Sequence, residues 1–209
     1  MKHLLIVGAG GFGREMFGAA REAVGFGSEF DVLGFLDARP GALDGFAGYP
    51  PVIGDPADYV PRADEVFVTA LGDIAARRRC VAALEAKGAR FMAVVHRSAF
   101  LGPNVSVGAG SFIAPHAVLT ADISVGRHAC VFHGSSVGHD TVLGDFAHVY
   151  AQCSLGGAVK VAPGARVFPG SVVVPRRTLG ADSTVGAGSV VILDVPAGTT
   201  VFGNPAAPI

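Results

Sequence analysis

The sequence predicts two domains, an α/β domain over residues 1–95 and an all-β parallel β-helix over residues 96–209. Three observations support this division. A glycine-rich loop follows the first apolar run, strand-like and helix-like segments then alternate up to about residue 90, and a strict six-residue repeat occupies the remainder. Alternating strands and helices are typical of a parallel sheet. A six-residue repeat is typical of a parallel β-helix.

The α/β domain is predicted from the order of its segments. The run HLLIVGAG reads as a buried strand, and VLGFLD and EVFVTALG read as two further strands. Residues 14–24 and 74–88 have helical patterns between and after them. The segment FMAVVHRSA, residues 91–99, is expected to form the last strand and to lead into the repeats. The result is a small, Rossmann-like domain with room for only a truncated sheet.

The repeat begins at Leu101 and continues without a slip. Two places before each aliphatic residue, twelve of sixteen positions are Ala, Ser, Thr or Cys, and three places after it, twelve of sixteen are Gly, Asn, Asp or His. The latter types tolerate a positive φ best, so this position should form a tight turn. Three repeats should make one 18-residue coil. The sixteen aliphatic positions are Leu101, Val107, Ile113, Leu119, Val125, Val131, Val137, Leu143, Val149, Leu155, Val161, Val167, Val173, Leu179, Val185 and Val191.

The composition excludes several classes of function. A formal net charge of −1 over 209 residues provides no basic surface for nucleic acid or for a membrane. The apolar start of the chain is short and breaks into glycines, so we expect a strand there rather than a signal peptide. No run reaches the roughly 18 apolar residues of a membrane span. Cys80, Cys130 and Cys153 have no paired or metal-type spacing, which favours a reducing, cytoplasmic location.

The glycine-rich loop has the pattern G-x-G-x-x-G at Gly8, Gly10 and Gly13, between a strand and a helix. Such a loop lets a phosphate approach the backbone at a helix N-terminus. Asp37 follows the second strand, where a ribose-binding acid would stand. We expect a nucleoside diphosphate here rather than NAD, because no second dinucleotide-binding half is visible. A tight turn that binds nothing is the alternative.

A histidine–aspartate pair interrupts the repeat at His139 and Asp140. Asp140 stands at the turn position, where aspartate is favoured by its tolerance of a positive φ. His139 stands at the outward corner position before it, where the turn has no preference for histidine. Histidine suits general-base catalysis near neutral pH, and a neighbouring carboxylate can fix its tautomer. One coil further lies Gly157, whose backbone N–H could act as an oxyanion donor. A solvated surface pair is the alternative.

Nearly the whole chain resembles the PglD/NeuD-type sugar acetyltransferases of bacterial glycan pathways, members of the hexapeptide-repeat acyltransferase superfamily. The motifs VGAGGFG, GFLD, ALGD with Arg77 downstream, SSVGHDTVLGDFAHV, VGAGSVV and VFGNPAAPI occur in that family's order. The resemblance implies a left-handed β-helix, a homotrimer, acetyl-CoA as co-substrate and no metal. It also implies a nucleotide-linked amino sugar as acceptor, of the UDP-4-amino-sugar type. Phe12 stands where relatives often carry histidine, and the tail lacks their basic residue.

The resemblance also implies individual roles. His139 corresponds to the family's base and Asp140 to the acid that follows it. His148, Gly157 and Ala187 fall at acetyl-CoA-binding positions. Because His148 lies half a coil from His139, the two could share a site only if β-helices associate side by side. The nucleotide-sugar positions are Gly8, Gly10, Gly11, Phe12, Gly13, Asp37, Gly72 and Asp73.

We therefore expect an N-acetyltransferase, with sugar O-acetylation as the nearest alternative. A zinc β-helix similar to γ-type carbonic anhydrases is a different class, suggested by His128 and His133, with only His96 near a third ligand position. An NAD-dependent enzyme with a β-helical stalk is a third. The trimer is expected because outward residues of the β-helix are apolar, namely Phe132, Tyr150, Phe168, Val174 and Ile192.

Overall fold

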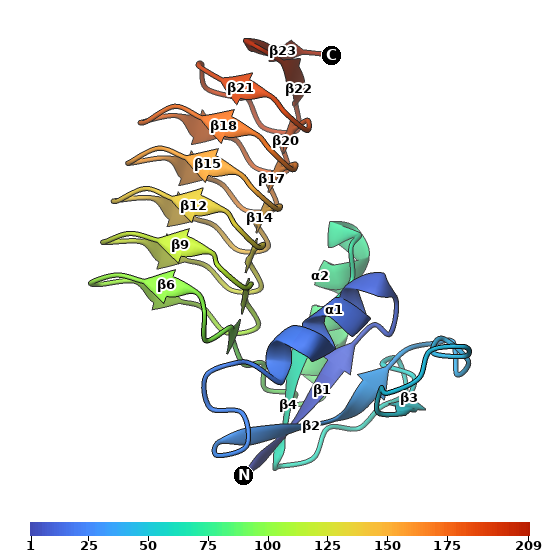
Figure 1. The fold of residues 1–209 in the computed structure, drawn as a ribbon. Coiled ribbons are helices and arrows are strands. Elements are labelled where there is room, and N and C mark those ends of the chain that lie inside the picture. Colours follow the sequence, from blue (N-terminus) through green and yellow to red (C-terminus); the bar gives the residue numbers. More distant parts are fainter. The chain divides into compact units, whose positions relative to one another are not determined.

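The computed structural model describes residues 1–209 and divides into two compact units, Met1–Val94 and Val95–Ile209. Figure 1 shows an α/β unit followed by a left-handed parallel β-helix, as predicted. Neither of the two helices is long and apolar enough to cross a membrane.

The N-terminal unit is a four-stranded sheet in the order β3-β2-β1-β4, and all its neighbouring strands are parallel. The central strand β1 has four consecutive buried residues at its end, which is typical of a parallel strand covered on both faces. The elements are β1 (Lys2–Val7), α1 (Gly11–Ala20), β2 (Phe30–Leu36), β3 (Val52–Gly54), β4 (Glu65–Thr69) and α2 (Ile74–Ala86).

Two details of this unit differ from the expectation. Strand β3 was not predicted, because three residues are too few to show a period. The segment 91–99 is not one strand. Phe91 forms an isolated bridge with Phe67 of the N-terminal sheet, and Val94–Val95 form β5, which joins a sheet of the β-helix. The segment therefore connects the two units.

Gly13 allows α1 to lie close to the end of β1. A Cβ atom at this position would stand 2.0 Å from the carbonyl oxygen of Gly8, which is backbone and cannot move aside cheaply. We expect Gly13→Ala to lower the free energy of unfolding by about 1–3 kcal/mol. Gly18→Ala is the matched control on the same helix, since a Cβ there meets nothing within 4 Å. It should stabilise by about 0.8–1 kcal/mol. Urea unfolding of both variants checks this, and equal stability would contradict it.

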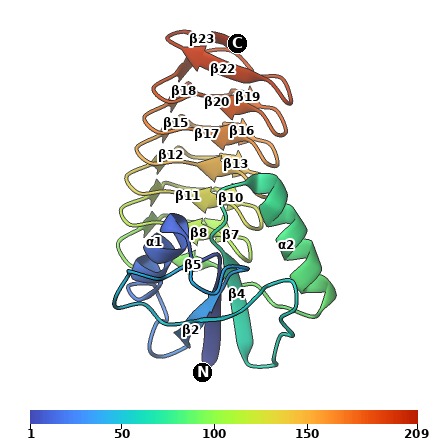
Figure 2. The same ribbon diagram turned by 90° about the vertical axis from the view of Figure 1, so that its right-hand side faces the viewer.

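The β-helix has three sheets, and its coils contribute parallel two-residue strands to each of them (Figure 2); only at the C-terminal end does the third sheet carry longer strands, β22 and β23, which pair antiparallel. The first sheet holds β7 (Ser106–Val107), β10 (Ser124–Val125), β13 (Val142–Leu143), β16 (Lys160–Val161) and β19 (Thr178–Leu179). The second holds β6 (Phe100–Leu101), β9 (Val118–Leu119), β12 (Ser136–Val137), β15 (Ser154–Leu155), β18 (Val172–Val173) and β21 (Val190–Val191). The third holds β5 (Val94–Val95), β8 (Phe112–Ile113), β11 (Cys130–Val131), β14 (His148–Val149), β17 (Arg166–Val167), β20 (Thr184–Val185), β22 (Thr200–Gly203) and β23 (Ala206–Pro208).

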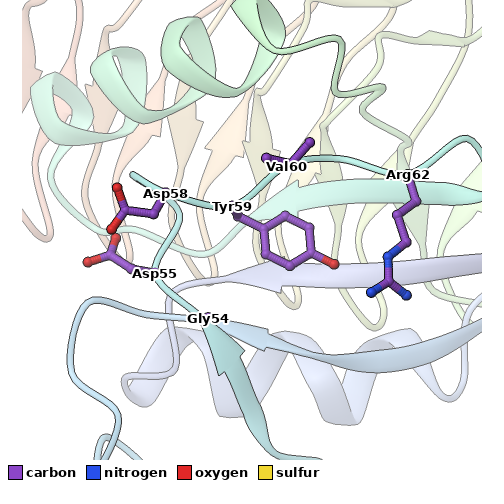
Figure 3. Close-up of a pocket in the computed structure, with 6 residues that line it drawn as sticks. All are labelled: Gly54, Asp55, Asp58, Tyr59, Val60 and Arg62. Carbon is purple, nitrogen blue, oxygen red and sulfur yellow. The ribbon is translucent and has the colours of Figure 1, made fainter.

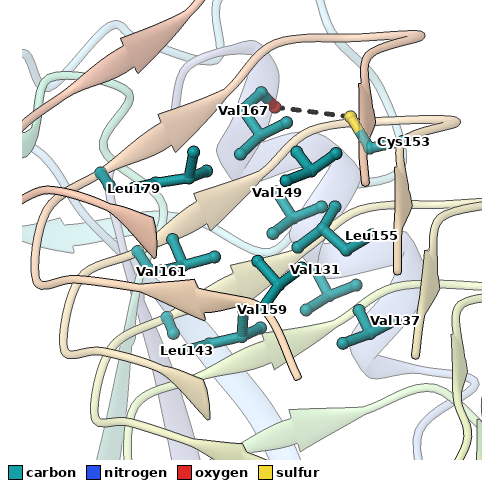
Figure 4. Close-up of a cluster of buried hydrophobic side chains, with 14 of the residues drawn as sticks. Val131, Val137, Leu143, Val149, Cys153, Leu155, Val159, Val161, Val167 and Leu179 are labelled. Atoms are coloured by element: carbon teal, nitrogen blue, oxygen red, sulfur yellow. Dashed lines mark hydrogen bonds between the residues drawn. The ribbon is translucent and has the colours of Figure 1, made fainter. Parts of the chain in front are cut away.

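The aliphatic residues of the repeat form the core, as predicted. All from Ile113 to Val191 are at most 3% exposed, whereas Leu101 and Val107, in the first coil, are half-buried. Pairing residues lie 18 positions apart, so each aliphatic side chain stacks on the equivalent one of the next coil. Figure 4 shows this stack, with the Cys153 thiol directed at the carbonyl oxygen of Val167, 3.5 Å away.

The turn position behaves as the sequence indicated. Every sixth residue from Asn104 to Gly188 has a positive φ, between 55° and 74°. His116, His128 and Asp140 are among them, so local backbone geometry accounts for their places. Even Arg176, with φ 64°, adopts this conformation, which shows that stacking of the coils overrides the preference of a single residue.

One corner position leaves its backbone N–H outside the hydrogen-bonded ladder. The backbone N–H groups of His139 and Gly157, each two places after an inward aliphatic, donate to no backbone acceptor, whereas those of their neighbours do; Gly138 bonds to Leu155 and Asp140 to Ala121, and Gly156 bonds to Val173 and Ala158 to His139. Proline, which has no N–H, accordingly occupies this position at Pro103, Pro115, Pro163, Pro169 and Pro175. His139 and Gly157 occupy the same position in adjacent coils.

The outward aromatic residues of the third sheet are less exposed than expected. Phe132 is 8% exposed, and Tyr150 and Phe168 are half-buried. Their rings form a column, with centroids 5.3 Å apart for Phe132 and Tyr150 and 4.8 Å apart for Tyr150 and Phe168. Of the five outward residues, only Ile192 is freely exposed, at 45%. Stacking within the chain hides surface that the sequence pattern assigned to solvent.

Candidate active site

His139 and Asp140 lie at the corner between β12 and β13. The Nδ1 atom of His139 stands 2.7 Å from Oδ2 of Asp140. Both side chains are largely exposed, at 68% and 63%, so the pair adds little to stability. Its effect is on the ring, because a carboxylate at Nδ1 favours a proton there and leaves Nε2 as the acceptor.

Gly157 lies directly beside this ring in the next coil. A Cβ at Gly157 would stand 2.6 Å from Nε2 of His139 and 2.7 Å from Cε1. Only glycine therefore leaves the imidazole in this place. The N–H of Gly157 donates to no protein acceptor, since it belongs to the corner position outside the ladder. A proton acceptor and an unused donor thus lie close together at one corner.

The other two residues assigned to acetyl-CoA lie elsewhere on the β-helix. His148 is in β14, on the third sheet, and is 1% exposed. Ala187 lies at the corner after β20, between the third and second sheets, and is exposed. Neither reaches the corner of His139 within one chain, as expected for His148. A site that uses all these residues requires a second β-helix.

The predicted nucleotide-binding positions gather at the carboxyl edge of the N-terminal sheet. Gly8 directly follows β1 with φ +103°, and a Cβ at this position would stand only 2.9 Å from the carbonyl oxygen of Ala70, so glycine is required there. Gly10 caps α1 with an ordinary φ of −72°. A Cβ at Gly10 or Gly11 meets nothing within 4 Å, so space is open above the helix N-terminus. The unpaired N–H groups of a first helical turn favour an anion in such space.

Asp37, which follows β2, holds the glycine-rich loop through a hydrogen bond. Its Oδ2 accepts from Ala9 N–H at 2.9 Å and from the Arg39 guanidinium at 3.0 Å, and its Oδ1 accepts from the backbone and Nε of Arg39, both at 3.0 Å. Burial raises the pKa of Asp37, but the hydrogen bonds from Arg39 and Ala9 outweigh it, and the net pKa lies below the usual value. Nucleoside binding by Asp37 stays a prediction.

The remaining nucleotide-sugar positions are arranged as follows. Asp73 caps α2, since its Oδ1 accepts from Ala76 N–H at 2.6 Å. Gly72 beside it is exposed and has open space at its Cβ position. Phe12 is half-buried in the first turn of α1. Arg77, further along α2, is fully buried and donates to Thr69 at 2.7 Å, which ties the helix to the end of β4.

The histidines of the zinc alternative do not converge. His128 is buried and stacks on Phe146 with ring centroids 4.9 Å apart, while His133 lies exposed at another corner. No three His, Cys, Asp or Glu side chains are grouped so that they could hold a metal ion. This geometry does not support a site of the carbonic anhydrase type.

Residues 3–84 match the family described as the PglD N-terminal domain. Three solved structures are similar over the whole chain. A perosamine N-acetyltransferase variant from Caulobacter crescentus, with a histidine replaced by asparagine and with CoA and GDP-perosamine bound, has 28% identity and a TM-score of 0.89, covering 100% of this chain and 97% of that one. WeeI from Acinetobacter baumannii has 26% identity and a TM-score of 0.72, with 100% of both chains covered. The acetyltransferase domain of PglB from Neisseria gonorrhoeae, in complex with acetyl coenzyme A, has 27% identity and a TM-score of 0.63, covering 100% and 99%. The resemblance inferred from the sequence motifs is confirmed.

Sequence reasoning missed two polar residues at the carboxyl edge. Arg39 holds Asp37 and was not singled out. Asp55 follows β3 as Asp37 follows β2, and was overlooked because β3 itself was not predicted. The signal was present in the letters VIGD, which repeat the pattern of GFLD and ALGD, an apolar run closed by aspartate.

Proposed function

We propose that this chain, a PglD-type N-terminal domain followed by a hexapeptide-repeat β-helix, is an acetyl-CoA-dependent N-acetyltransferase. Its acceptor is the amino group of a nucleotide-linked sugar. The observation that carries the proposal is the corner at which His139, bonded to Asp140, lies against Gly157, whose N–H donates to no group of the chain. The similar Caulobacter crescentus protein holds CoA and GDP-perosamine, a nucleotide amino sugar.

His139 acts as the general base. As the amine nitrogen attacks the thioester carbonyl, Nε2 accepts a proton from that nitrogen, and Asp140 stabilises the imidazolium that forms through its bond to Nδ1. The same proton can then pass to the departing thiolate of coenzyme A. No covalent enzyme intermediate is required.

Gly157 stabilises the tetrahedral intermediate. Its N–H makes no hydrogen bond in the protein, so it can donate to the developing oxyanion without losing another partner. The preceding residue, Gly156, donates to Val173 at 2.9 Å and so anchors the corner in the ladder. The donor is therefore held rigidly, as stabilisation of a transition state requires.

The N-terminal unit binds the nucleotide part of the acceptor. The open space at Gly10 and Gly11, above the first turn of α1, receives the diphosphate. The carboxyl ends of β2 and β3 then flank the nucleoside, as in other open parallel sheets.

A coupled thiol-release assay tests the function. Purified protein is mixed with acetyl-CoA and a panel of nucleotide sugars, each supplied as an amino sugar and as its hydroxyl counterpart. We expect thiol release with at least one amino sugar and an N-acetylated product by mass spectrometry. Release with hydroxyl counterparts alone would indicate O-acetylation, which the same base could serve, and release with none would contradict the proposal.

The active form is proposed to be a cytoplasmic homotrimer. Residues assigned to acetyl-CoA lie on different sides of one β-helix, so a complete site needs a neighbour. The second sheet also exposes apolar side chains at Phe100, Val118 and Val172, at 57%, 37% and 39%. The three cysteines are free, which fits a reducing compartment.

Sedimentation equilibrium at micromolar concentration should therefore give three times the chain mass of 21.2 kDa. The physical reason is that exposed apolar area of this kind favours association. A mass of one chain under assay conditions, with acetyl transfer retained, would contradict the trimer.

A further inference from the structure

A hollow of about 380 Å³ opens at the carboxyl ends of β2 and β3, and Asp37 in its lining is bonded to Ala9 of the glycine-rich loop. Its walls include apolar side chains, Pro40, Val52 and Ile53. Ile53 is 39% exposed, so part of a large aliphatic side chain is open to a ligand. Two carboxylates, Asp37 and Asp55, border the same hollow. Apolar walls with a few polar groups are typical of a site for a small molecule.

The two carboxylates differ in what they can still accept. A carboxylate has about four acceptor positions. Those of Asp37 are filled by the four hydrogen bonds from Ala9 and Arg39. Asp55 accepts a single hydrogen bond, from Ala57 N–H to Oδ1 at 2.8 Å, in a turn that follows β3. Its second oxygen accepts from no group of the chain.

Asp55 also borders a neighbouring hollow of about 340 Å³ with Asp58, Tyr59 and Arg62 (Figure 3). Arg62 N–H and the Tyr59 hydroxyl both bond to the buried Glu65, and Figure 3 shows Arg62 away from the two aspartates. No cation therefore pairs with Asp55. Its carboxylate is available to a ligand that brings hydrogen-bond donors.

We infer that this hollow holds the base of the nucleotide sugar and that Asp55 selects guanine. The inference rests on the proposed function for the class of ligand, a nucleotide sugar. Guanine presents two adjacent donors, N1–H and the exocyclic N2 amino group, and a carboxylate presents two adjacent acceptors. The pair can form two parallel hydrogen bonds, while Pro40 and Ile53 contact the ring system.

Other bases fit this carboxylate less well. Uracil has one donor, N3–H, flanked by two carbonyl oxygens, so a second carboxylate oxygen would face a lone pair. Adenine offers its amino group beside the acceptor N1, which gives one hydrogen bond and one repulsion. Because a bidentate contact discriminates strongly between bases, we expect GDP to bind at least about tenfold more tightly than UDP or ADP.

Equilibrium binding of free GDP, UDP and ADP to the purified full-length protein tests the inference without requiring catalysis. Asp55→Asn is the variant, since its amide oxygen can still accept from Ala57 N–H and keep the turn. It offers guanine one acceptor instead of two, so the preference for GDP over UDP should fall to about threefold or less. Asp58→Asn, which removes the neighbouring charge, is the matched control and should keep the preference.

The outcomes separate this inference from the proposed function. Equal or tighter binding of UDP, no binding of any nucleotide, or an unchanged preference in Asp55→Asn would each overturn the guanine assignment. A GDP preference that depends on Asp55 supports it even if the thiol-release assay detects no acetyl transfer, in which case only the proposed function fails. Acetyl transfer to a UDP-linked amino sugar, with no GDP preference, leaves the function standing and overturns the assignment.

Discussion

Replacing His139 with alanine should lower kcat for acetyl transfer by about 10²- to 10⁴-fold, the usual cost of losing a general base. With Nδ1 held by the Asp140 carboxylate at 2.7 Å, Nε2 of the imidazole is left to accept the proton of the attacking amine. Binding of acetyl-CoA should survive. The fold should be unchanged, because the side chain is 68% exposed and lies outside the hydrogen-bonded ladder.

The Asp140→Asn variant separates the base from the group that orients it. This variant keeps the imidazole and alters only its orientation and the stability of the imidazolium, so kcat should fall less than in His139→Ala. Steady-state kinetics with thiol detection and binding of acetyl-CoA by calorimetry provide the readouts. Turnover of His139→Ala within a few-fold of the unchanged protein would remove this residue from the mechanism.

The β-helix could be predicted in detail because each of its coils is specified by residue types six positions apart. Inward aliphatics, small residues and turn residues all appear in fixed places, so the buried column from Ile113 to Val191 and the positive φ values follow directly from the letters. The corner of His139 and Gly157 also followed, since a period of 18 residues places them in adjacent coils.

The N-terminal unit was less predictable because its contacts are not periodic. The bonds that fill the acceptor positions of Asp37 come from Arg39, two residues away, and from Ala9 in the glycine-rich loop. No rule of residue spacing predicts these hydrogen bonds. Strand β3 is only three residues long and shows no period of its own, so the only sign of the aspartate that follows it is the likeness of VIGD to GFLD and ALGD.

The aromatic column shows a different limit of pattern reading. The repeat correctly placed Phe132, Tyr150 and Phe168 on the outer face, but it does not report whether outward rings meet solvent or one another. Stacking at about 5 Å between centroids is favoured for rings one coil apart, since coils lie about 4.8 Å apart. Exposure therefore depends on neighbours that a one-residue pattern does not describe.

Gly157→Ala should lower kcat by about 10²-fold while leaving the protein folded. The new methyl group would stand 2.6 Å from Nε2 of His139, well inside van der Waals contact, and must displace the ring. The ring can move because it is the exposed end of a side chain, and Gly157 does not have a positive φ that would strain alanine. A displacement of about 1 Å can cost a reaction 10²-fold, although every catalytic group is still present.

A double variant tests whether the effect acts through His139. If Gly157→Ala works only by displacing the base, adding it to His139→Ala should cost little more than His139→Ala alone, because the displaced group is already missing. Kinetics of both single variants and the double variant give this coupling, and thermal unfolding confirms that all three remain folded. Independent, multiplicative losses would instead mean that the methyl group obstructs the thioester itself. Gly157 would then shape the coenzyme site, and the position of the imidazole would not explain why glycine stands there.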